Sequence, residues 1–330
     1  MNIIMSKAVG IIVNPNSGTD ARRLTSNAQF MDNIQKLRIL KSIVMGLIGS
    51  GITQIEIMPD YLGIASNLVN DIKGNGADIL MIDIDPEGNL NDTKKAVEHF
   101  KKDNVSLIIL LGGDGTLRAA AEQSIDIPFL PISTGTNNTI PYLVEGTVAG
   151  LASGYFVNYR LNEGLCNLNK IDVYINNEFT NIGLVEVSTT KYKFKGTGII
   201  DLSMIIDSVI IFGKPTSIGV ASIGGLIKQL DCDTKKFVYI NFNGKNYKLK
   251  SIESPGVIKD VYIDNYKIID VGNKVKMEKS YFIEIDGERS ISVDENDNVE
   301  VYVNSNGPKL LDINKIMEIV SERGLFKENL

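Results

Sequence analysis

The sequence predicts α/β plus all-β: an N-terminal doubly wound α/β domain, then a C-terminal antiparallel β-rich (sandwich-like) domain, and a final helix that returns to the first domain. The chain has 330 residues, a length typical of about two domains. Its first half alternates short apolar runs with amphipathic helix patterns, and its second half changes to short runs rich in Val, Ile and Tyr. We expect a nucleotide-binding α/β domain at 1–155 (plus 306–330) and a β-rich substrate and oligomerisation domain at 156–305.

Strands that alternate with helices imply a parallel sheet with helices on both faces, as expected for the first domain. We expect Asn91 or Asp92 as the N-cap of one helix. We also expect Pro141 in the first turn of another helix, where proline is tolerated. The expected strands are 8–13, 53–58, 77–84, 105–111 and 128–133, and the expected helices are 30–51, 64–74, 91–103, 116–124 and 139–156.

The second domain is predicted from five β-rich runs at 170–188, 236–252, 260–271, 280–293 and 298–304. Asn176-Asn177, Asn243-Gly244 and Asp286-Gly287 have the composition of two-residue hairpin turns. The run at 312–324 is an amphipathic helix pattern with an apolar face that needs a surface to cover. We expect that surface on the first domain.

Composition excludes several classes of protein. The net charge of −6 argues against a nucleic-acid groove, which needs clustered Lys and Arg. The most apolar segment, 198–213, is interrupted by Asp201 and Asp207, so we expect no membrane span. The first residues lack a basic region and a cleavage site, so we expect no signal peptide. Cys166 and Cys232 indicate a reduced cytoplasmic protein with two incidental thiols.

His99 is the only histidine, and it lies in a polar helix pattern. We expect a solvated helix residue there. A Ser-His-Asp triad or a His-based metal site would have to depend on this one side chain.

Three polar, glycine-bearing loops follow predicted strands: "NPNSGT" at 14–19, "GGDGT" at 112–116 and "STGTNN" at 133–138. In open α/β sheets, ligands bind at the carboxyl ends of the strands. Glycines let the backbone approach an anion, and helix N-termini offer N–H groups, so phosphate is the expected ligand. The first loop is also compatible with a simple turn, the third with an N-cap, and Asp114 with a capping role.

Two nucleotide-binding motifs are missing from the sequence. GxxxxGK[ST] does not occur, so we expect no P-loop enzyme, and GxGxxG does not follow a strand. An oxidoreductase with a dinucleotide-binding site is therefore disfavoured.

The "NPNSG", "GGDGT" and "GTNN" segments, in this order and ahead of a β domain, resemble the superfamily of NAD kinases, diacylglycerol kinases and sphingosine kinases. Within it, "NDTKKAVEHFKKDNVSLIILLGGDGTLR", "IPYLVEGTVAGLASGYF", "YKFKGTGIID" and "TSIGVASIGGL" resemble the ATP-NAD kinase-like branch named after the acetoin-catabolism X protein. The resemblance covers nearly the whole chain and implies ATP and substrate in a cleft between the two domains.

The resemblance gives Asp114 the central role, as a ligand of Mg²⁺ or as the group that activates the acceptor hydroxyl. Phosphoryl transfer needs mainly positioning and charge neutralisation, so a protein with one histidine can perform it. The residues expected to line the nucleotide or its phosphates are Asn14, Gly18, Gly112, Gly113, Gly115, Thr116, Gly135, Thr136, Asn137 and Asn138.

The sequence departs from its relatives at two positions. Asn138 stands where diacylglycerol-kinase relatives usually have Asp, and an amide cannot act as a base. Val185 stands where NAD kinases have the Asn of an Asn-Glu pair, and only Glu186 is kept. ATP use is therefore better supported than NAD use.

Three further features have two interpretations each. "EIDGERS" resembles the late Asp-Gly of the superfamily, but a hairpin turn at Asp286 is the stronger interpretation. Arg118 could contact phosphate or lie on the helix surface. Lys191, Lys193 and Lys195 alternate and could form a phosphate-attracting rim or protect an edge strand.

We expect an ATP- and Mg²⁺-dependent kinase that phosphorylates a hydroxyl of NAD(H) or a related small molecule. We also expect a homo-oligomer without nucleic-acid partners. The alternatives are a lipid or sphingoid kinase of the diacylglycerol kinase type and a catalytically inactive nucleotide-binding regulator.

Overall fold

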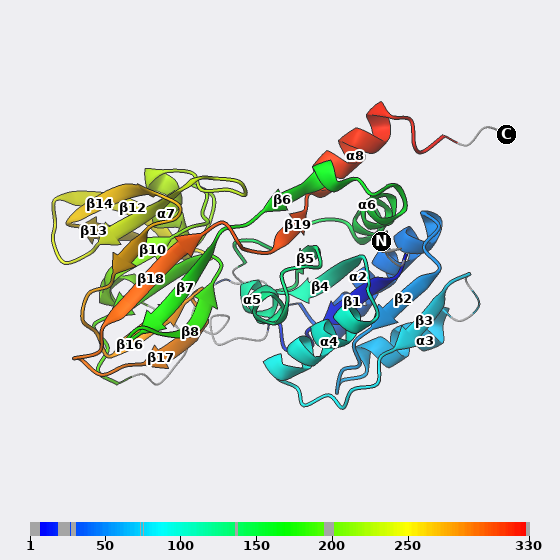
Figure 1. Cartoon of the computed structure of the whole chain (residues 1–330), viewed down its shortest axis with the longest axis horizontal. Coiled ribbons are helices and arrows are strands. Elements are labelled where there is room, and N and C mark those ends of the chain that lie inside the picture. Colours follow the sequence, from blue (N-terminus) through cyan, green and yellow to red (C-terminus); the bar gives the residue numbers. More distant parts are fainter. Residues whose placement is uncertain are drawn as a thin grey trace.

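The computed structural model describes residues 7–18, 27, 31–72, 74, 76–135, 138–194 and 201–327. Within them, the first domain is built on a seven-stranded sheet in the order β3-β2-β1-β4-β5-β19-β6 (Figure 1). Strands β1 to β5 are parallel, β19 is parallel to β5, and β6 is antiparallel to β19. The strands are β1 (Val9–Val13), β2 (Gln54–Ile57), β3 (Asp78–Met81), β4 (Leu107–Gly112), β5 (Phe129–Ser133), β6 (Leu165–Asn167) and β19 (Lys309–Leu311).

Helices cover both faces of this sheet, which confirms the predicted doubly wound α/β domain. One face packs against α2 (Asn33–Gly49), α3 (Ile64–Ile72), α6 (Gly146–Tyr159) and α8 (Ile313–Glu322), and the other against α4 (Leu90–Lys102) and α5 (Asp114–Gln123). Side chains alternate along β1: Val9, Ile11 and Val13 face the first layer and Ile12 faces the second. Gly150 allows helices α2 and α6 to approach closely, because any side chain at this position would overlap the Ile43 carbonyl of α2.

The structure corrects two of the predicted helix starts. Helix α6 begins at Gly146 with Glu145 as N-cap, and Pro141 lies in the preceding loop, where Tyr142 bridges to Ile132 of β5. Helix α4 is capped by Asn89, whose side chain accepts from the Asn91 amide. Asp92 instead turns back to accept from the amides of Glu87 and Gly88. Asn89 and Asp92 both accept hydrogen bonds from backbone amides near the start of α4, but only Asn89 is at the N-cap position.

The second domain is antiparallel and β-rich, as predicted. A six-stranded sheet, β14-β11-β10-β9-β16-β17, packs against a four-stranded sheet, β15-β18-β7-β8, through an apolar core (Figure 1). The other face of the larger sheet is covered by α7 (Val220–Ile227) and the β12–β13 hairpin. The strands are β7 (Lys170–Ile175), β8 (Glu178–Gly183), β9 (Glu186–Thr190), β10 (Ile205–Ile210), β11 (Lys236–Asn241), β12 (Tyr247–Ser254), β13 (Val257–Ile263), β14 (Asn265–Asp270), β15 (Lys274–Lys276), β16 (Phe282–Ile285), β17 (Arg289–Ser292) and β18 (Val299–Asn304).

The three predicted hairpin turns have different outcomes. Asn176 and Asn177, with φ of 51° and 69°, form the predicted two-residue turn between β7 and β8. Asp286 and Gly287, with φ of 51° and 64°, connect β16 to β17, but the ladder pairs Ile285 with Arg289, so Glu288 is a third loop residue. Asn243-Gly244 is not a hairpin, because β11 pairs with β10 and β14 whereas β12 pairs with β13.

The chain returns to the first domain after β18, as predicted. Strand β19 joins the first sheet beside β5, and α8 then packs its apolar face into the core of that domain. Figure 1 shows β6 and β19 side by side, where the chain leaves the first domain and re-enters it. No helix in the described ranges is long and apolar enough to cross a membrane.

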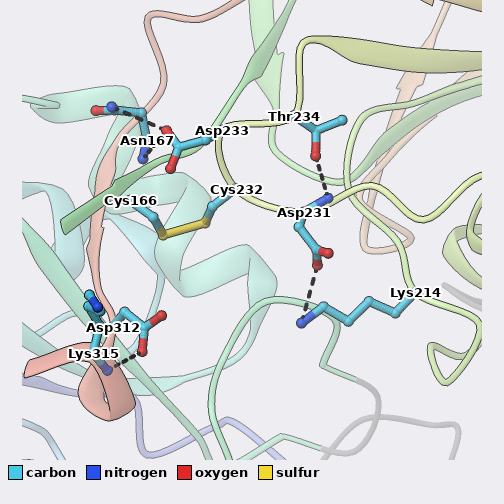
Figure 2. The surroundings of a disulfide bond; sticks show 9 residues. All are labelled: Cys166, Asn167, Lys214, Asp231, Cys232, Asp233, Thr234, Asp312 and Lys315. Atoms are coloured by element: carbon cyan, nitrogen blue, oxygen red, sulfur yellow. Dashed lines mark hydrogen bonds and ion pairs between the residues drawn. A yellow bond between two sulfur atoms is a disulfide. The ribbon is translucent and has the colours of Figure 1, made fainter. Parts of the chain in front are cut away.

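The two cysteines are not incidental thiols, which corrects the prediction from their number alone. Cys166 on β6 is disulfide-bonded to Cys232 in the loop between α7 and β11 (Figure 2). Beside the bond, the Asp233 amide donates to the Asn167 carbonyl at 2.9 Å. The pair could not be predicted because 66 residues separate its members and only the returning loop brings them together. The disulfide ties a strand of the first sheet to a loop of the β-rich domain.

Candidate functional site

The three glycine-bearing loops meet at one edge of the first sheet. They follow β1, β4 and β5, which are adjacent, and the strand order reverses between β1 and β4. Such a switch point opens a crevice at the carboxyl ends of the strands. The Asn14 amide donates to the Leu111 carbonyl at 2.9 Å, and the Thr134 amide donates to the Gly112 carbonyl at 3.2 Å. The loops are therefore held together by their own backbones.

Side chains add further links between these loops. Asn14 Nδ2 donates to Thr116 Oγ1 at 2.9 Å, and the hydroxyls of Ser17 and Thr134 lie 2.7 Å apart. Gly18 has a φ of 75°, and a Cβ there would lie 2.6 Å from the Thr134 carbonyl, so glycine is required for this close approach. The predicted residues Asn14, Gly18 and Thr116 are thus brought together. Thr136 and Asn137 lie outside the described residues.

Asp114 is the first residue of α5 and is 3% exposed. Its carboxylate accepts from the Thr139 amide at 2.8 Å and from the Ile140 amide at 2.9 Å, one on each oxygen. Burial raises the pKa of Asp114, the two hydrogen bonds lower it, and the negative charges of Glu288 and Asp286 raise it, so that the pKa is about 7. Asp114 therefore holds the loop after β5 in place and sits close to the balance between its two protonation states.

The space beside the glycines is filled by two side chains. A Cβ at Gly115 would overlap Glu288 Oε2, and one at Gly113 would lie 3.6 Å from Glu288 Oε1. The Asn138 side-chain oxygen lies 2.8 Å from the position of a Cβ at Gly113 and 2.7 Å from one at Gly135. Asn138 Nδ2 donates to Ser133 Oγ at 2.7 Å, which orients this amide over the loop. The glycines thus admit a carboxylate from the other domain to the N-terminus of α5.

Sequence reasoning missed Glu288. It is exposed on the loop between β16 and β17, and its carboxylate reaches across to the first turn of α5. Its place in "EIDGERS" was the available signal, but the sequence analysis predicts a role in that stretch for Asp286 only. A third loop residue after a positive-φ pair projects differently from a strand residue, and the sequence does not show which element it meets.

Asp286 is a buried link between the domains. Its carboxylate accepts from the amides of Leu184, Val185 and Glu186 at 2.8 to 3.2 Å and lies 3.3 Å from Arg118 Nε. Burial raises the pKa of Asp286, while the Arg118 charge and the backbone amides lower it. The residue therefore joins β16 both to the segment before β9 and to α5.

Arg118 does not lie on the helix surface, which was one of its two predicted positions. It is 1% exposed, and Nη1 donates to Glu122 at 2.7 Å and to Asn181 at 3.4 Å. Its guanidinium therefore contacts residues of the β-rich domain, Asn181 and Asp286. Glu122 is in turn 2.5 Å from Lys94. A buried Arg with carboxylates on two sides is an inter-domain clamp, because removing one partner leaves a charge without compensation.

Lys36 is a second residue that sequence reasoning missed. It is fully buried in α2, and its Nζ donates to the Pro15 carbonyl at 2.6 Å and to the Asn14 carbonyl at 3.3 Å. Burial lowers the pKa of Lys36 to about 8, and Asp60 and Asp32 oppose this. The residue places positive charge directly beneath the first loop.

The two residues compared with the NAD kinase Asn-Glu pair are buried. Val185 is 1% exposed and packs in the apolar core shared by α4, α5 and the segment before β9. Glu186 is 6% exposed at the start of β9. Neither side chain is presented on an open surface.

A shallow pocket lies beside the first loop. It is lined by Asn14, Asn16, Met58, Tyr61, Gly88 and Asp92. Asn16 spans it, donating to the Gly88 carbonyl at 3.0 Å and accepting from the Tyr61 hydroxyl at 2.5 Å. The volume of this pocket is about 20 Å³, which is enough for a water-sized group.

Two family models match the chain. Residues 9–156 match the ATP-NAD kinase N-terminal domain, and residues 169–306 match the acetoin catabolism protein X C-terminal domain. The chain therefore has an NAD kinase-like domain followed by a domain of the acetoin catabolism protein X type. This confirms the resemblance drawn from the motifs to the NAD kinase and diacylglycerol kinase-like superfamily and to that branch.

A curated relative and two solved structures are similar to the chain. Acetoin catabolism protein X of Cupriavidus necator is 26% identical over 340 residues, which cover 98% of this chain and 95% of that protein. A structure from Bacillus anthracis str. Sterne, assigned as a diacylglycerol kinase, aligns with 92% of this chain and 96% of its own, at 15% identity and a TM-score of 0.47. An NAD kinase from Archaeoglobus fulgidus, solved with ATP, aligns with 97% of this chain and 100% of its own, at 8% identity and a TM-score of 0.42.

Proposed function

We propose that this chain is an ATP- and Mg²⁺-dependent kinase that transfers a phosphoryl group to a hydroxyl of NAD or a related small molecule. One observation carries the proposal. Three glycine-bearing loops are hydrogen-bonded together at the switch point of an NAD kinase-like domain, and a carboxylate from the other domain meets them at a helix N-terminus.

The nucleotide phosphates would bind at the first turn of α5. Amide groups at a helix N-terminus lack intrahelical acceptors, and the helix dipole favours negative charge there. The proposed contacts are Gly112, Gly113, Gly115 and Thr116 on this turn, with Asn14 and Gly18 on one side and Gly135, Thr136, Asn137 and Asn138 on the other. The nucleoside would extend from the phosphates past Asn14 toward the half-exposed ring of Tyr61.

The carboxylate of Asp114 would hold Mg²⁺. Carboxylate oxygen is the donor that Mg²⁺ prefers, and the Glu288 charge raises the pKa of Asp114, a repulsion that a cation would relieve. When bound, the ion would neutralise charge on the phosphates. Asp114 would also keep the loop after β5 in register through the amides of Thr139 and Ile140.

Glu288 is suited to accept the proton of the acceptor hydroxyl. It is exposed, it comes from the β-rich domain, and it lies over Gly115. The hydroxyl oxygen would form a bond to the γ-phosphorus while the bond to the β–γ bridging oxygen breaks. The proton would pass to Glu288, and ADP would leave. An acceptor in the cleft between 1–155 (plus 306–330) and 156–305 would bring its hydroxyl to this point.

A phosphoryl-transfer screen tests the proposal. Purified protein, Mg²⁺ and γ-labelled ATP are incubated with NAD, NADH, diacylglycerol, sphingosine or a metabolite extract, alongside Asp114→Asn. Label in NADP, reduced in the variant, supports an NAD kinase. Label in diacylglycerol or sphingosine would mean that the acceptor is a lipid or sphingoid base and that the mechanism is the same. Absence of transfer to every acceptor would refute the proposed kinase activity.

A nucleotide-binding regulator without catalysis is the second candidate. It is favoured by Asp114, whose two carboxylate oxygens are already engaged by backbone amides, and by the buried Val185. This candidate predicts ATP binding by isothermal titration calorimetry without phosphoryl transfer. The same pair of measurements therefore separates the two functions.

We also propose a homo-oligomer that forms through the β-rich domain. Strands β12 and β13 pair with each other, and β14 contacts β12 through the rings of Tyr266 and Tyr247. These three strands expose the apolar and aromatic side chains of Tyr247, Ile252, Ile258, Tyr262, Tyr266 and Ile268. Such a group of side chains is typical of an interface. Light scattering after size-exclusion chromatography measures the mass, and a monomer would contradict the proposal.

A further inference from the structure

A cluster of His99, Glu56 and Asp103 lies on the face of the first sheet that α4 covers. His99 is in the last turn of α4, Asp103 is its C-cap, and Glu56 is on β2. His99 Nε2 is 3.3 Å from Asp103 Oδ2 and 3.9 Å from Glu56 Oε2. One ligand atom from each residue lies within 4.8 Å of the other two. The phosphate-binding turn of α5 and the loops after β1 and β5 contribute nothing to this cluster.

The Glu56 carboxylate is the unusual member of this cluster. Its side chain is 14% exposed, and Oε2 is buried without a hydrogen-bond donor among the residues described. A buried carboxylate oxygen without a donor is unfavourable, and a cation between the two carboxylates would compensate for it.

The spacing of the three atoms fits a small tetrahedral ion. Ligands at about 2.1 Å from a tetrahedral Zn²⁺ lie about 3.4 Å from one another. The two separations that involve His99, 3.3 and 3.9 Å, are close to this value, and the two carboxylate oxygens lie within 4.8 Å of each other. An imidazole nitrogen beside two carboxylates favours Zn²⁺, whereas Mg²⁺ and Ca²⁺ favour oxygen ligands alone. The C-terminal end of a helix also attracts positive charge.

We propose that Glu56, His99 and Asp103 bind one Zn²⁺ ion through Glu56 Oε2, His99 Nε2 and Asp103 Oδ2, with water as the fourth ligand. The ion ties the C-terminal end of α4 to β2. Its role is structural, because the cluster lies at the opposite end of α4 from Asp92 and the pocket beside Tyr61. Binding therefore stabilises the first domain and leaves the proposed phosphoryl transfer unchanged.

The competing explanation is a plain ion-pair triad, in which a protonated His99 bridges the two carboxylates. That arrangement needs no metal and binds none tightly. The two explanations differ in stoichiometry and in the environment of His99, which is the only imidazole in the chain.

The test uses the full chain, freed of metal with a chelator and titrated with ZnCl₂ by calorimetry. One Zn²⁺ per chain is expected, and Co²⁺ in its place should give the visible absorption of a tetrahedral site. His99→Gln and Glu56→Gln should weaken binding by at least about 100-fold, since loss of an outer-shell partner alone weakens it by about 10–100-fold. The matched control is Glu98→Gln, an exposed carboxylate on the same helix that pairs with Lys102.

Circular dichroism of each variant without metal checks that it is folded. The proposal is overturned by no stoichiometric binding at micromolar Zn²⁺, or by binding that His99→Gln leaves intact. NMR of the wild-type imidazole gives an independent answer. Its ring resonances should move on addition of one equivalent of Zn²⁺, and unchanged resonances would establish the ion-pair triad instead.

Discussion

The β7–β8 and β16–β17 hairpins have similar turn residues but differ in loop length and in the residues that their turns contact. Asn176-Asn177 and Asp286-Gly287 all have positive φ, and each pair is followed by a glutamate. In the first hairpin Glu178 pairs with Ile175 in the ladder. In the second, pairing resumes only at Arg289, so Glu288 is an additional loop residue.

The partners of the two turns differ as well. Asn176 bonds to Asp297 and Asn298, which belong to its own domain. Asp286 instead meets Arg118 of α5, and Glu288 lies over Gly115. Turn residues thus specify the local backbone, while the surface that faces the turn decides whether it links domains or simply reverses the chain. Changes matched between the two hairpins can test this difference.

The largest effect is expected for Glu288→Gln against Glu178→Gln. If Glu288 accepts the hydroxyl proton, its amide variant should lower the rate of phosphoryl transfer by about 10²–10⁴-fold. Glu178→Gln, at the matching place in the other hairpin, should leave the rate unchanged. Both rates are measured with labelled ATP and the acceptor found in the screen. Equal rates in the two variants would remove Glu288 from the chemistry.

The next effect is on stability and concerns Arg118→Met. The variant leaves the Asp286 carboxylate buried without its cation, so the free energy of unfolding should fall by about 3–5 kcal/mol. Urea unfolding measures it. The control is Lys94→Met, which breaks a half-exposed pair with Glu122 and should change stability by less than about 1 kcal/mol. Similar losses in the two variants would contradict an inter-domain clamp at Arg118.

The pH dependence of stability tests how the second hairpin acts on Asp114. Its pKa is about 7 in the folded chain and 3.8 ordinarily, so its contribution is complete below pH 3.8 and is lost as pH rises to about 7. At about 1.4 kcal/mol per pKa unit, the upper limit of this loss is roughly 4 kcal/mol. The part of this loss of stability that is absent in Asp114→Asn is the contribution of the Asp114 carboxyl group.

Glu288→Gln should reduce that loss, because the Glu288 charge is one cause of the raised pKa of Asp114. Glu178→Gln should leave it unchanged. The measurement is urea unfolding of the wild type and both variants between pH 4 and pH 8. A loss that stays constant in Glu288→Gln would place the cause in burial and in the Asp286 charge.

The fold class could be predicted because its signals are local and periodic. Alternating apolar runs and helix patterns specify the first sheet and its helix layers, and the loops at 14–18 and 112–116 mark the edge where the candidate site lies. Short elements were harder. Strands β6 and β19 have three residues each, too few for a periodic pattern, and they form only where the chain leaves and re-enters the first domain.

The candidate site was predictable where it depends on backbone shape and not where it depends on distant partners. Gly18 and the glycines around Asp114 indicate, from the sequence itself, that other groups approach the backbone closely at these positions. Lys36 does not, because its burial depends on the carbonyls of Asn14 and Pro15, which lie 22 and 21 residues away. Asn181 and Asp286, two of the partners of Arg118, lie still further along the chain, so a surface position was an equal expectation.

The smallest effect should come from the turn residues themselves. Gly287→Ala places a side chain at a φ of 64° and should lower the free energy of unfolding by about 1–2 kcal/mol. Asn177→Gly, at a φ of 69°, removes a side chain from the same kind of conformation and should change stability by no more than about 0.5 kcal/mol. Urea unfolding compares the two. An equal loss in Asn177→Gly would mean that its side-chain contacts, and not the backbone conformation, hold the first turn, and that the two hairpins differ already in their turn chemistry.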